Sequence, residues 1–108
     1  MTYKKNWIEE GLDVAHKDNP EQKMTVNRIL RQNKQIKVQE GDDWVSKTKS
    51  FIIGVEVHYW ELDKDTEKNK LMIAKFHTRL LIPWEIAMES FLKGSNVITQ
   101  FIKKINSL

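Results

Sequence analysis

Residues 51–62 read FIIGVEVHYWEL, and this stretch decides the fold of the chain. It is dense in β-branched and aromatic side chains, the residue types that are enriched in β-strands. Alternate side chains of a strand point to opposite faces, which would put Val55, Val57 and Tyr59 on one face. The stretch therefore predicts a long strand in a protein that is mainly β.

A second β-rich run, residues 70–82, follows the polar turn at residues 63–69. Two such runs separated by a short polar segment are typical of an antiparallel hairpin. Both faces of this hairpin carry apolar and polar groups, so the alternation does not decide which face is the core. We therefore expect one long hairpin whose buried face the sequence leaves open.

Upstream of the hairpin, residues 12–17 alternate like a short strand and end in the turn residues Asp18-Asn19-Pro20. Residues 23–30 are rich in β-formers, and their closeness to the first strand predicts an antiparallel pair. In residues 31–50 the pattern dissolves, and Gly41-Asp42-Asp43 adds a turn signal. We expect a long loop or a flapping hairpin at 31–50, since segments of this length tend to be functional or mobile.

Four or five short strands with a long segment between the second and the third indicate a small half-open barrel. Several motifs in this order resemble those of the YodC-like family of small bacterial proteins. The matching stretches are Gly11–Lys17, Met24-Thr25-Val26, Gly54–Trp60 and Lys75–Pro83. The resemblance covers roughly residues 8–83. It implies an SH3-like barrel of unknown biochemical role, with no catalytic residues to carry over.

The chain departs from the family pattern in several places. An extra leucine stands before Asp13, the spacing from proline to methionine is longer, and the 31–50 segment is an insertion. The fold class that we expect is mainly β with C-terminal α: a small SH3-like half-open antiparallel barrel followed by two short helices. A single domain would span residues 1–108, with the barrel at 8–83 and the helical tail at 84–108, outside the resemblance.

The helical tail begins after Pro83, because proline is tolerated in the first turn of a helix. Residues 84–93 are compatible with a helix that ends at Gly94, a residue suited to the C-cap. Ser95 can cap a second helix. The apolar residues of that helix recur at three- and four-residue spacing, at Val97, Ile98, Phe101, Ile102 and Ile105. We expect it to pack on the domain's own barrel, with a partner chain as the second choice and a membrane as the third.

The composition excludes several classes of protein. The 108 residues contain no cysteine, and 18 Lys and Arg against 15 Asp and Glu give a net charge of +3. The sequence therefore has no disulfide, thiolate zinc site or thiol nucleophile. No apolar run approaches the roughly 20 residues that cross a bilayer. The N-terminal residues lack the apolar region of a signal peptide, so we expect a cytoplasmic protein.

Catalytic and metal chemistry have little support in the sequence. His58 and His77 are weak candidates for a metal site, because they would share one only if the hairpin register set them opposite or diagonal to each other. Cross-strand contacts are the favoured interpretation of both. The sequence has no Gly-x-Ser-x-Gly elbow and no glycine-rich phosphate loop. We therefore expect no enzyme, no cofactor and no bound metal.

Binding is the better interpretation. Tyr59, Trp60, Phe76 and Trp44 would suit an aromatic platform, although for the first three a place in the core is favoured. Trp44 is the exception, since it lies among charged residues. The candidate binding residues are Arg28, Arg31, Lys34, Lys37, Trp44, Trp60, Lys75 and Arg79. We expect an interaction module that binds a protein or peptide through the 31–50 segment and the adjacent strand face.

The alternative is a small barrel that binds nucleic acid. Residues 28–37 contain four cations and no acid, and Lys47 and Lys49 would add to the phosphate contacts. The acidic residues at 40–43 follow at once and partly cancel this charge. A third possibility is a homo-oligomer that forms through the helix at 95–108.

Overall fold

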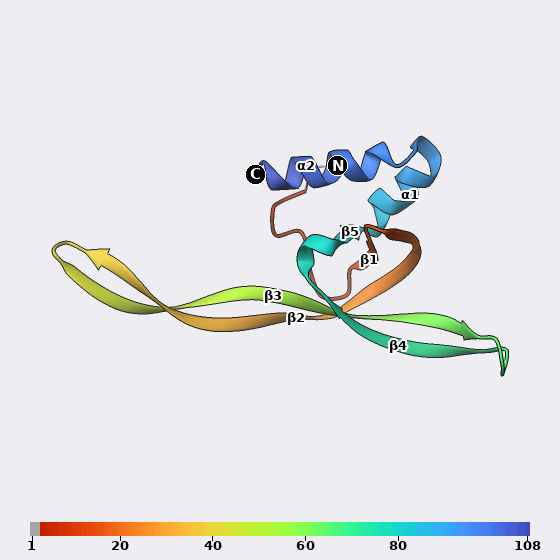
Figure 1. Ribbon diagram of the computed structural model, residues 1–108, viewed down its shortest axis with the longest axis horizontal. Coiled ribbons are helices and arrows are strands. Elements are labelled where there is room, and N and C mark those ends of the chain that lie inside the picture. The colour runs from red at the N-terminus through yellow and green to blue at the C-terminus, as the bar shows by residue number, and fades with distance from the viewer. Residues whose placement is uncertain (1–2) are drawn as a thin grey trace.

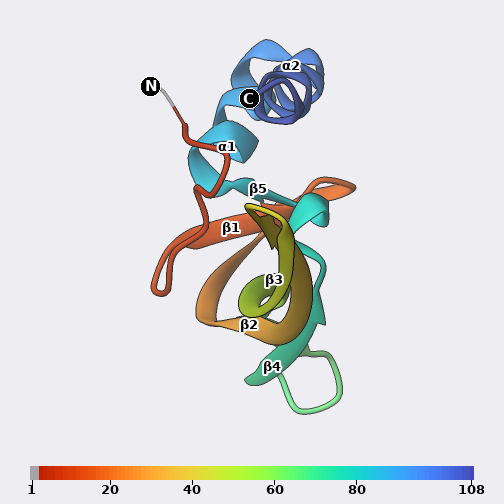
Figure 2. The same ribbon diagram turned by 90° about the vertical axis from the view of Figure 1, so that its left-hand side faces the viewer.

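Two strands of more than twenty residues each dominate the structure, and two helices cover one side of the sheet (Figures 1 and 2). The computed structural model describes residues 3–108. The elements in chain order are β1 (Asp13–His16), β2 (Asn19–Glu40), β3 (Asp43–Asp63), β4 (Lys68–Phe76), the 3-10 turn η1 (Thr78–Leu80), β5 (Leu81–Pro83), α1 (Trp84–Lys93) and α2 (Asn96–Asn106).

The five strands form one antiparallel sheet in the order β4-β3-β2-β1-β5. Strands β1 to β4 follow one another as a meander, and β5 returns to the far side to pair with β1. The edges of the sheet are β4 and β5, so the sheet is open. The expectation of a mainly β fold with two C-terminal helices is confirmed, whereas closure into an SH3-like barrel is not confirmed.

The predicted pairing of the first two strands is confirmed, with Val14 opposite Met24. The turn that joins them is shorter than expected. It consists of Lys17 and Asp18, and β2 already begins at Asn19. The proline at position 20 therefore lies inside β2, near the start of the strand, where a missing N–H costs least.

Residues 31–50 are not a loop. They belong to the distal parts of β2 and β3, which pair in unbroken register from Arg31 opposite Ile52 to Glu40 opposite Asp43. The turn between them has two residues, and the first is Gly41 with a φ of 62°, a left-handed conformation that glycine adopts without strain. The interpretation as a long loop is therefore wrong, and the hairpin alternative describes the segment.

The predicted strand at 70–82 is in fact two strands. β4 ends at Phe76, and the Nδ1 atom of His77 accepts a hydrogen bond of 3.3 Å from the backbone N–H of Arg79, which starts η1. The chain then crosses to the other edge of the sheet as β5. The predicted hairpin of β3 and β4 is confirmed up to Phe76, and its continuation to residue 82 is wrong.

The strand register decides which face of the hairpin is buried. Val55 and Val57 are completely buried in a first core cluster. The other buried members of this cluster are Val14, Met24, Val26 and Leu81. Next to it, Gly54 lies so close to β4 that a Cβ atom there would come within 3.1 Å of the carbonyl oxygen of Phe76. The absence of a side chain at Gly54 therefore allows the two strands to approach.

A second core cluster joins the helices to the β1–β5 edge of the sheet. Its buried members are Ala15, Ile82, Ala87, Ile98 and Phe101. The rings of Tyr3 and Trp7, from the N-terminal segment, pack edge-on against Phe101 with centroid distances of 5.4 and 5.8 Å. The expectation that the second helix packs on its own domain is thus confirmed.

The two helices meet at Gly94, as the sequence predicts. Gly94 has a φ of 98°, and its N–H donates to the carbonyl of Ser90 at 2.8 Å, which closes α1. Ser95 occupies the N-cap position of α2, but its side chain makes no capping hydrogen bond. The capping role predicted for the Ser95 side chain is therefore wrong.

Tyr3 makes the stability of this layer sensitive to alkaline pH. Its hydroxyl donates to Oε2 of Glu85 at 2.8 Å. Burial, followed by the hydrogen bond to Glu85, raises the pKa of Tyr3 from 10.0 to about 12. The folded chain therefore keeps a proton that the unfolded chain loses above pH 10, and this contribution to stability disappears between pH 10 and about 12.

We expect the urea midpoint of the wild-type chain to fall more steeply across this window than that of Tyr3→Phe, which has no proton to lose. The midpoints of both proteins are measured at several pH values between 8 and about 12. Below pH 10 the difference between the two midpoints should be constant. Parallel curves over the whole range would contradict the raised pKa.

Candidate interaction surfaces

The most distinctive surface of the molecule is a two-stranded ribbon, residues 31–52, which we refer to as the arm. In the described residues, β2 and β3 pair here only with each other. β1 pairs with β2 only up to Thr25, and β4 ends at Phe76, opposite Val55. Figure 1 shows the arm leaving the body and ending far from the helices. The radius of gyration is 17.8 Å, whereas a compact chain of this length would have about 13 Å.

The arm exposes nearly all of its surface. None of its residues is fully buried, and the half-buried ones are Ile36, Val38, Val45, Phe51 and Ile52. A two-stranded ribbon without a covered face is marginally stable in water, so it adds little to the stability of the domain. Its two long edges also carry backbone groups that can pair with another strand. The arm is thus a contact surface and not a part of the core.

The rest of the arm, residues 31–39 and 45–52, which we refer to as the shaft, is basic on both faces. Lys34 lies opposite Lys49, and their Nζ atoms are 5.9 and 5.4 Å from the ring centroid of Phe51. Arg31 and Lys37 project from the other face, because neighbouring pairs of a ribbon alternate between its faces. The basic stretch at 28–37 therefore does not form a single patch.

The end of the arm, residues 40–44, is acidic and aromatic, and we refer to it as the tip. The side chain of Trp44 is 65% exposed. The Nζ atom of Lys47 donates to Oε1 of Glu40 at 2.5 Å. Asp42 and Asp43 form no ion pair with any residue between 3 and 108. The tip therefore presents an exposed indole on one face of the ribbon, and the carboxylates of Asp43 on the other face and of Asp42 in the turn.

A second exposed apolar surface lies at the other end of β3, and we refer to it as the outer patch. Its members are Trp60, Leu62, Leu71 and Ile73. Trp60 lies opposite Leu71 and is 59% exposed, so the expectation that it belongs to the core is wrong. Tyr59 and Phe76, in contrast, pack against the first core cluster, as the sequence analysis favoured.

The two exposed tryptophans do not form one aromatic platform. Trp60 follows Trp44 by sixteen residues along the same strand, which corresponds to roughly 50 Å at 3.3 Å per residue. The other two members of the suggested platform, Tyr59 and Phe76, lie on the inner face. The tip and the outer patch are therefore separate surfaces.

Arg28 and Lys75 lie on the outer face of the sheet, away from the arm. Nε of Arg28 is 3.2 Å from Oε2 of Glu56, and the same glutamate lies opposite Lys75 on the next strand. The three side chains form a row across β2, β3 and β4. The positive charge of Arg28 is therefore partly neutralised by Glu56.

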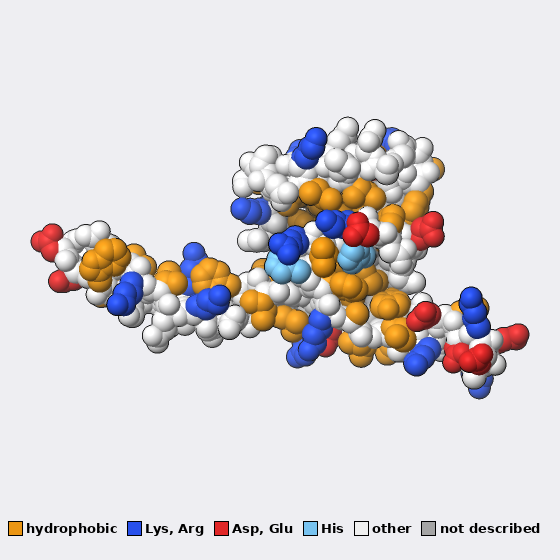
Figure 3. Space-filling model, in the orientation of Figure 1, with side chains coloured by type: hydrophobic (Ala, Val, Ile, Leu, Met, Phe, Trp, Pro, Cys, Tyr) orange, Lys and Arg blue, Asp and Glu red, His pale blue; other side chains and the backbone are white. Residues whose placement is uncertain are grey.

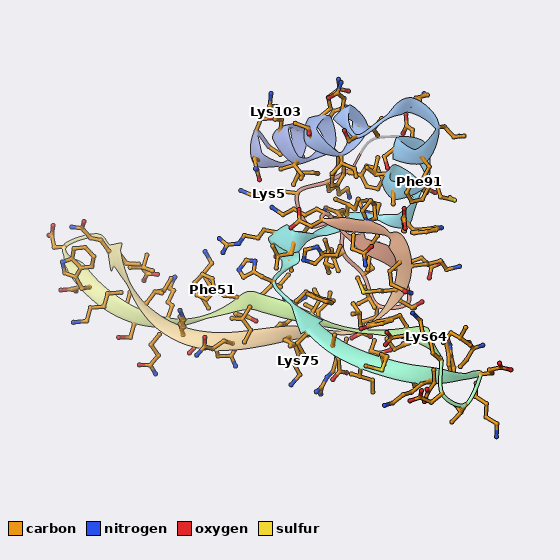
Figure 4. All side chains as sticks on the ribbon, turned by 45° about the vertical axis from the view of Figure 1, so that its right-hand side comes forward. Lys5, Phe51, Lys64, Lys75, Phe91 and Lys103 are labelled. Atoms are coloured by element: carbon orange, nitrogen blue, oxygen red, sulfur yellow. The ribbon has the colours of Figure 1, made fainter. Side chains whose placement is uncertain are left out.

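Arg31 and Arg79 meet at an open cleft at the base of the arm, which we refer to as the root cleft. Its volume is about 440 Å³, and Lys5, Trp7 and Ile105 are also in its lining. Lys and Arg side chains gather along the groove between the helices and the sheet (Figure 3). Lys5 and Phe51 border this groove from the N-terminal segment and from β3 (Figure 4).

The two candidate histidines are engaged in separate local contacts. Nδ1 of His58 contacts Oδ1 of Asn27, and His58 lies opposite Ile73 in the register. His77 holds η1 through the N–H of Arg79. Between residues 3 and 108, no group of three or more His, Asp or Glu side chains is placed to hold a metal ion.

Sequence reasoning missed Lys5 and Trp7 as members of a site. Both belong to the N-terminal segment, which has no regular structure, and only its packing against α2 brings them to Arg31 and Arg79. No spacing in the sequence signals a contact over such a separation. Within residues 3–108, no helix has the length and apolar character needed to cross a membrane.

Comparison with known proteins finds no matching family model, curated protein or solved structure. The function is therefore argued from the arm, its tip, the outer patch and the root cleft.

Proposed function

We propose that this chain is a non-enzymatic interaction module whose arm inserts its tip into a protein partner. The observation that carries the proposal is the arm itself, which projects from the body and ends at the exposed Trp44. Tryptophan is among the residues that most often contribute the largest share of the binding free energy when they are buried in a protein interface. Asp42 and Asp43 add a preference for a partner with a basic rim.

The edges of the arm offer a second contact mode to the same partner. A partner strand that adds to β2 or β3 would pair with their free backbone groups. The lysines along the shaft oppose indiscriminate pairing between arms, because like charges would then face each other across the edge. The arm is therefore suited to a selected partner more than to unspecific aggregation.

Nucleic acid is the second candidate. Phe51 with Lys34 and Lys49 around it combines an aromatic face with cations, the combination that binds single-stranded bases and phosphates. The carboxylates of Asp42 and Asp43 would be repelled by phosphates at the tip. We therefore place a protein partner first.

The SH3-like barrel and the relationship to the YodC-like family belong to this proposal as well. They are supported by a strand path in which β5 returns beside β1 after a 3-10 turn. We infer that β2 and β3 of such a small barrel are extended here into the arm. A cytoplasmic location is part of the same proposal.

The first test places a photoreactive amino acid at position 44 and, in a matched variant, at position 60. In cells of the source organism, we expect a crosslinked protein from position 44 that position 60 does not give. This protein is then purified, and its affinity for the full chain is measured by calorimetry. Trp44→Ala should weaken binding about thirtyfold, which corresponds to a truncated tryptophan hot spot of about 2 kcal/mol. Trp60→Ala should leave the affinity unchanged.

A second variant shortens the arm and keeps its turn. Deleting residues 35–40 and 43–48 joins Lys34 and Lys49, which already lie opposite each other, through Gly41-Asp42. Each strand loses an even number of residues, so the remaining side chains keep their faces. We expect partner binding to be lost while the melting temperature stays nearly unchanged.

Full partner affinity in the shortened chain would contradict the proposal. The same variants are also mixed with a labelled single-stranded oligonucleotide at low salt. Oligonucleotide binding that the shortened chain retains through Lys34, Lys49 and Phe51, together with no crosslink from position 44, would favour the nucleic-acid alternative over a protein partner.

A further inference from the structure

The root cleft has the chemistry of a site for an acidic ligand. Three cations, Lys5, Arg31 and Arg79, are in its lining, and no aspartate or glutamate is. Trp7 and Ile105 supply apolar surface in the same lining. A volume of about 440 Å³ lies within the range of pockets that hold ligands. The cleft is thus suited to a group that combines negative charge with an apolar body.

The basic surface continues from the root cleft along the groove beside α2. A neighbouring cleft of about 220 Å³ shares Trp7, Arg79 and Ile105 with it and adds Lys17 to the lining. This neighbouring cleft also has no acidic residue in its lining. A ligand seated in the root cleft would therefore meet cations and no carboxylate in the linings of both clefts, which favours an acidic group there.

The tip of the arm has the complementary chemistry. It offers the exposed indole of Trp44 and the carboxylates of Asp42 and Asp43, which have no ion pair among the described residues. Trp44 and Asp43 are on opposite faces of the ribbon, with Asp42 in the turn. A tip that enters the cleft end-on therefore presents an apolar and an acidic side together.

A chain cannot place its tip in its own root cleft. Arg31 and Ile52 belong to both the cleft and the base of the arm. The tip lies nine residues farther along the paired strands, roughly 30 Å away at 3.3 Å per residue. The ribbon is paired in register over this whole length and does not fold back. Only the cleft of another molecule is within reach.

We propose that the tip of one copy of this chain docks into the root cleft of a second copy. This inference rests on the proposed function and names the chain itself as the partner of the arm. The contact uses two different surfaces, so it repeats head to tail and yields rings or open filaments. A single tip covers much less than the 800 Å² that a stable partner usually buries, which makes each contact weak. Association should therefore depend on concentration, and it should weaken with salt.

The test measures the mass of the purified full chain by sedimentation velocity from micromolar to millimolar concentration at low salt. We expect the mean mass to rise with concentration and to fall back towards the monomer at high salt. The tip variant Asp42→Lys/Asp43→Lys and the cleft variant Lys5→Glu/Arg79→Glu should each stay monomeric. Control reversals with the same change in charge are Asp65→Lys/Glu67→Lys, in the turn between β3 and β4, and Lys64→Glu/Lys68→Glu, in this turn and at the first residue of β4. Both should still associate.

Mixing the tip variant with the cleft variant gives the sharpest result. The first retains a native cleft and the second retains a native tip, so the native contact can form between them, and the reversed tip of the first is also complementary in charge to the reversed cleft of the second. We expect the two variants, each monomeric alone, to associate when they are mixed, in complexes that contain both. Far-ultraviolet circular dichroism and tryptophan fluorescence establish beforehand that both variants are folded.

Three results would overturn the inference: a wild-type chain that is monomeric at every concentration, a tip variant that still associates alone, or a mixture in which the two variants do not associate. A monomeric chain whose crosslinked partner is still lost in Trp44→Ala would overturn self-docking and leave the proposed function of the arm intact. Association that appears only after a single-stranded oligonucleotide is added would also overturn it and assign the cations to phosphate.

Discussion

Phe101→Ala is expected to lower the free energy of unfolding by about 3–5 kcal/mol, the cost of emptying an aromatic core position. The ring of Phe101 is 7% exposed and holds the rings of Tyr3 and Trp7 edge-on. Without it, a cavity opens between α2 and the N-terminal segment, and two aromatic contacts of about 0.5–1.5 kcal/mol each are lost. Thermal unfolding should show a fall in Tm of more than about 10 °C.

The matched control is Phe91→Ala. Phe91 lies on the same helical layer but is 52% exposed and contacts Trp84 at a centroid distance of 6.2 Å. We expect Phe91→Ala to lower the free energy of unfolding by less than about 1.5 kcal/mol. Equal losses in the two variants would contradict the packing of α2 against the N-terminal segment.

Ile82→Ala is expected to lower the free energy of unfolding by about 2–5 kcal/mol. Ile82 is completely buried in β5, opposite Ala15 of β1, where the sheet meets the helices. Removing three carbon atoms there leaves a void that neither layer can fill without moving. Urea unfolding should show a lower midpoint with an unchanged m-value, since the folded topology is kept.

The control for this position is Ile73→Ala. The side chain of Ile73 is 60% exposed on the outer patch, so its removal should change the free energy of unfolding by no more than about 0.5 kcal/mol. Ile82→Val, which removes one methyl group, should lose about 0.5–1.5 kcal/mol. An Ile82→Ala chain as stable as Ile73→Ala would disprove the placement of β5 between the two layers.

The sequence predicts the parts of the fold that have one covered face. Residues 51–62 are recognisable because they are dense in β-branched and aromatic side chains, and the run from Val97 to Ile105 because burial selects its apolar side chains at a regular spacing. The arm has no such spacing, because both of its faces meet solvent and burial selects neither. The two strands of the arm form because their backbones pair from the turn at Gly41 to the body. The periodicity of the sequence does not reveal this pairing.

The candidate site was only partly predictable for a related reason. Trp44 stands out in the sequence because a large indole lies among charges, and its exposure in the structure agrees with that interpretation. The basic residues at 28–37 look like one cluster in sequence, yet an extended strand sends neighbours to opposite faces. The root cleft depends on contacts between residues 5–8, the arm base and α2, which are far apart in sequence.

The length of the arm does not affect the folding of the body. Its two-residue turn closes a regular ladder, and no arm residue enters either core cluster. Adding or removing two residues in each strand would therefore change the reach by about 6.6 Å, at 3.3 Å per residue, and would leave both cores intact. The number of residues in the arm thus sets the distance between the body and the partner that binds the tip.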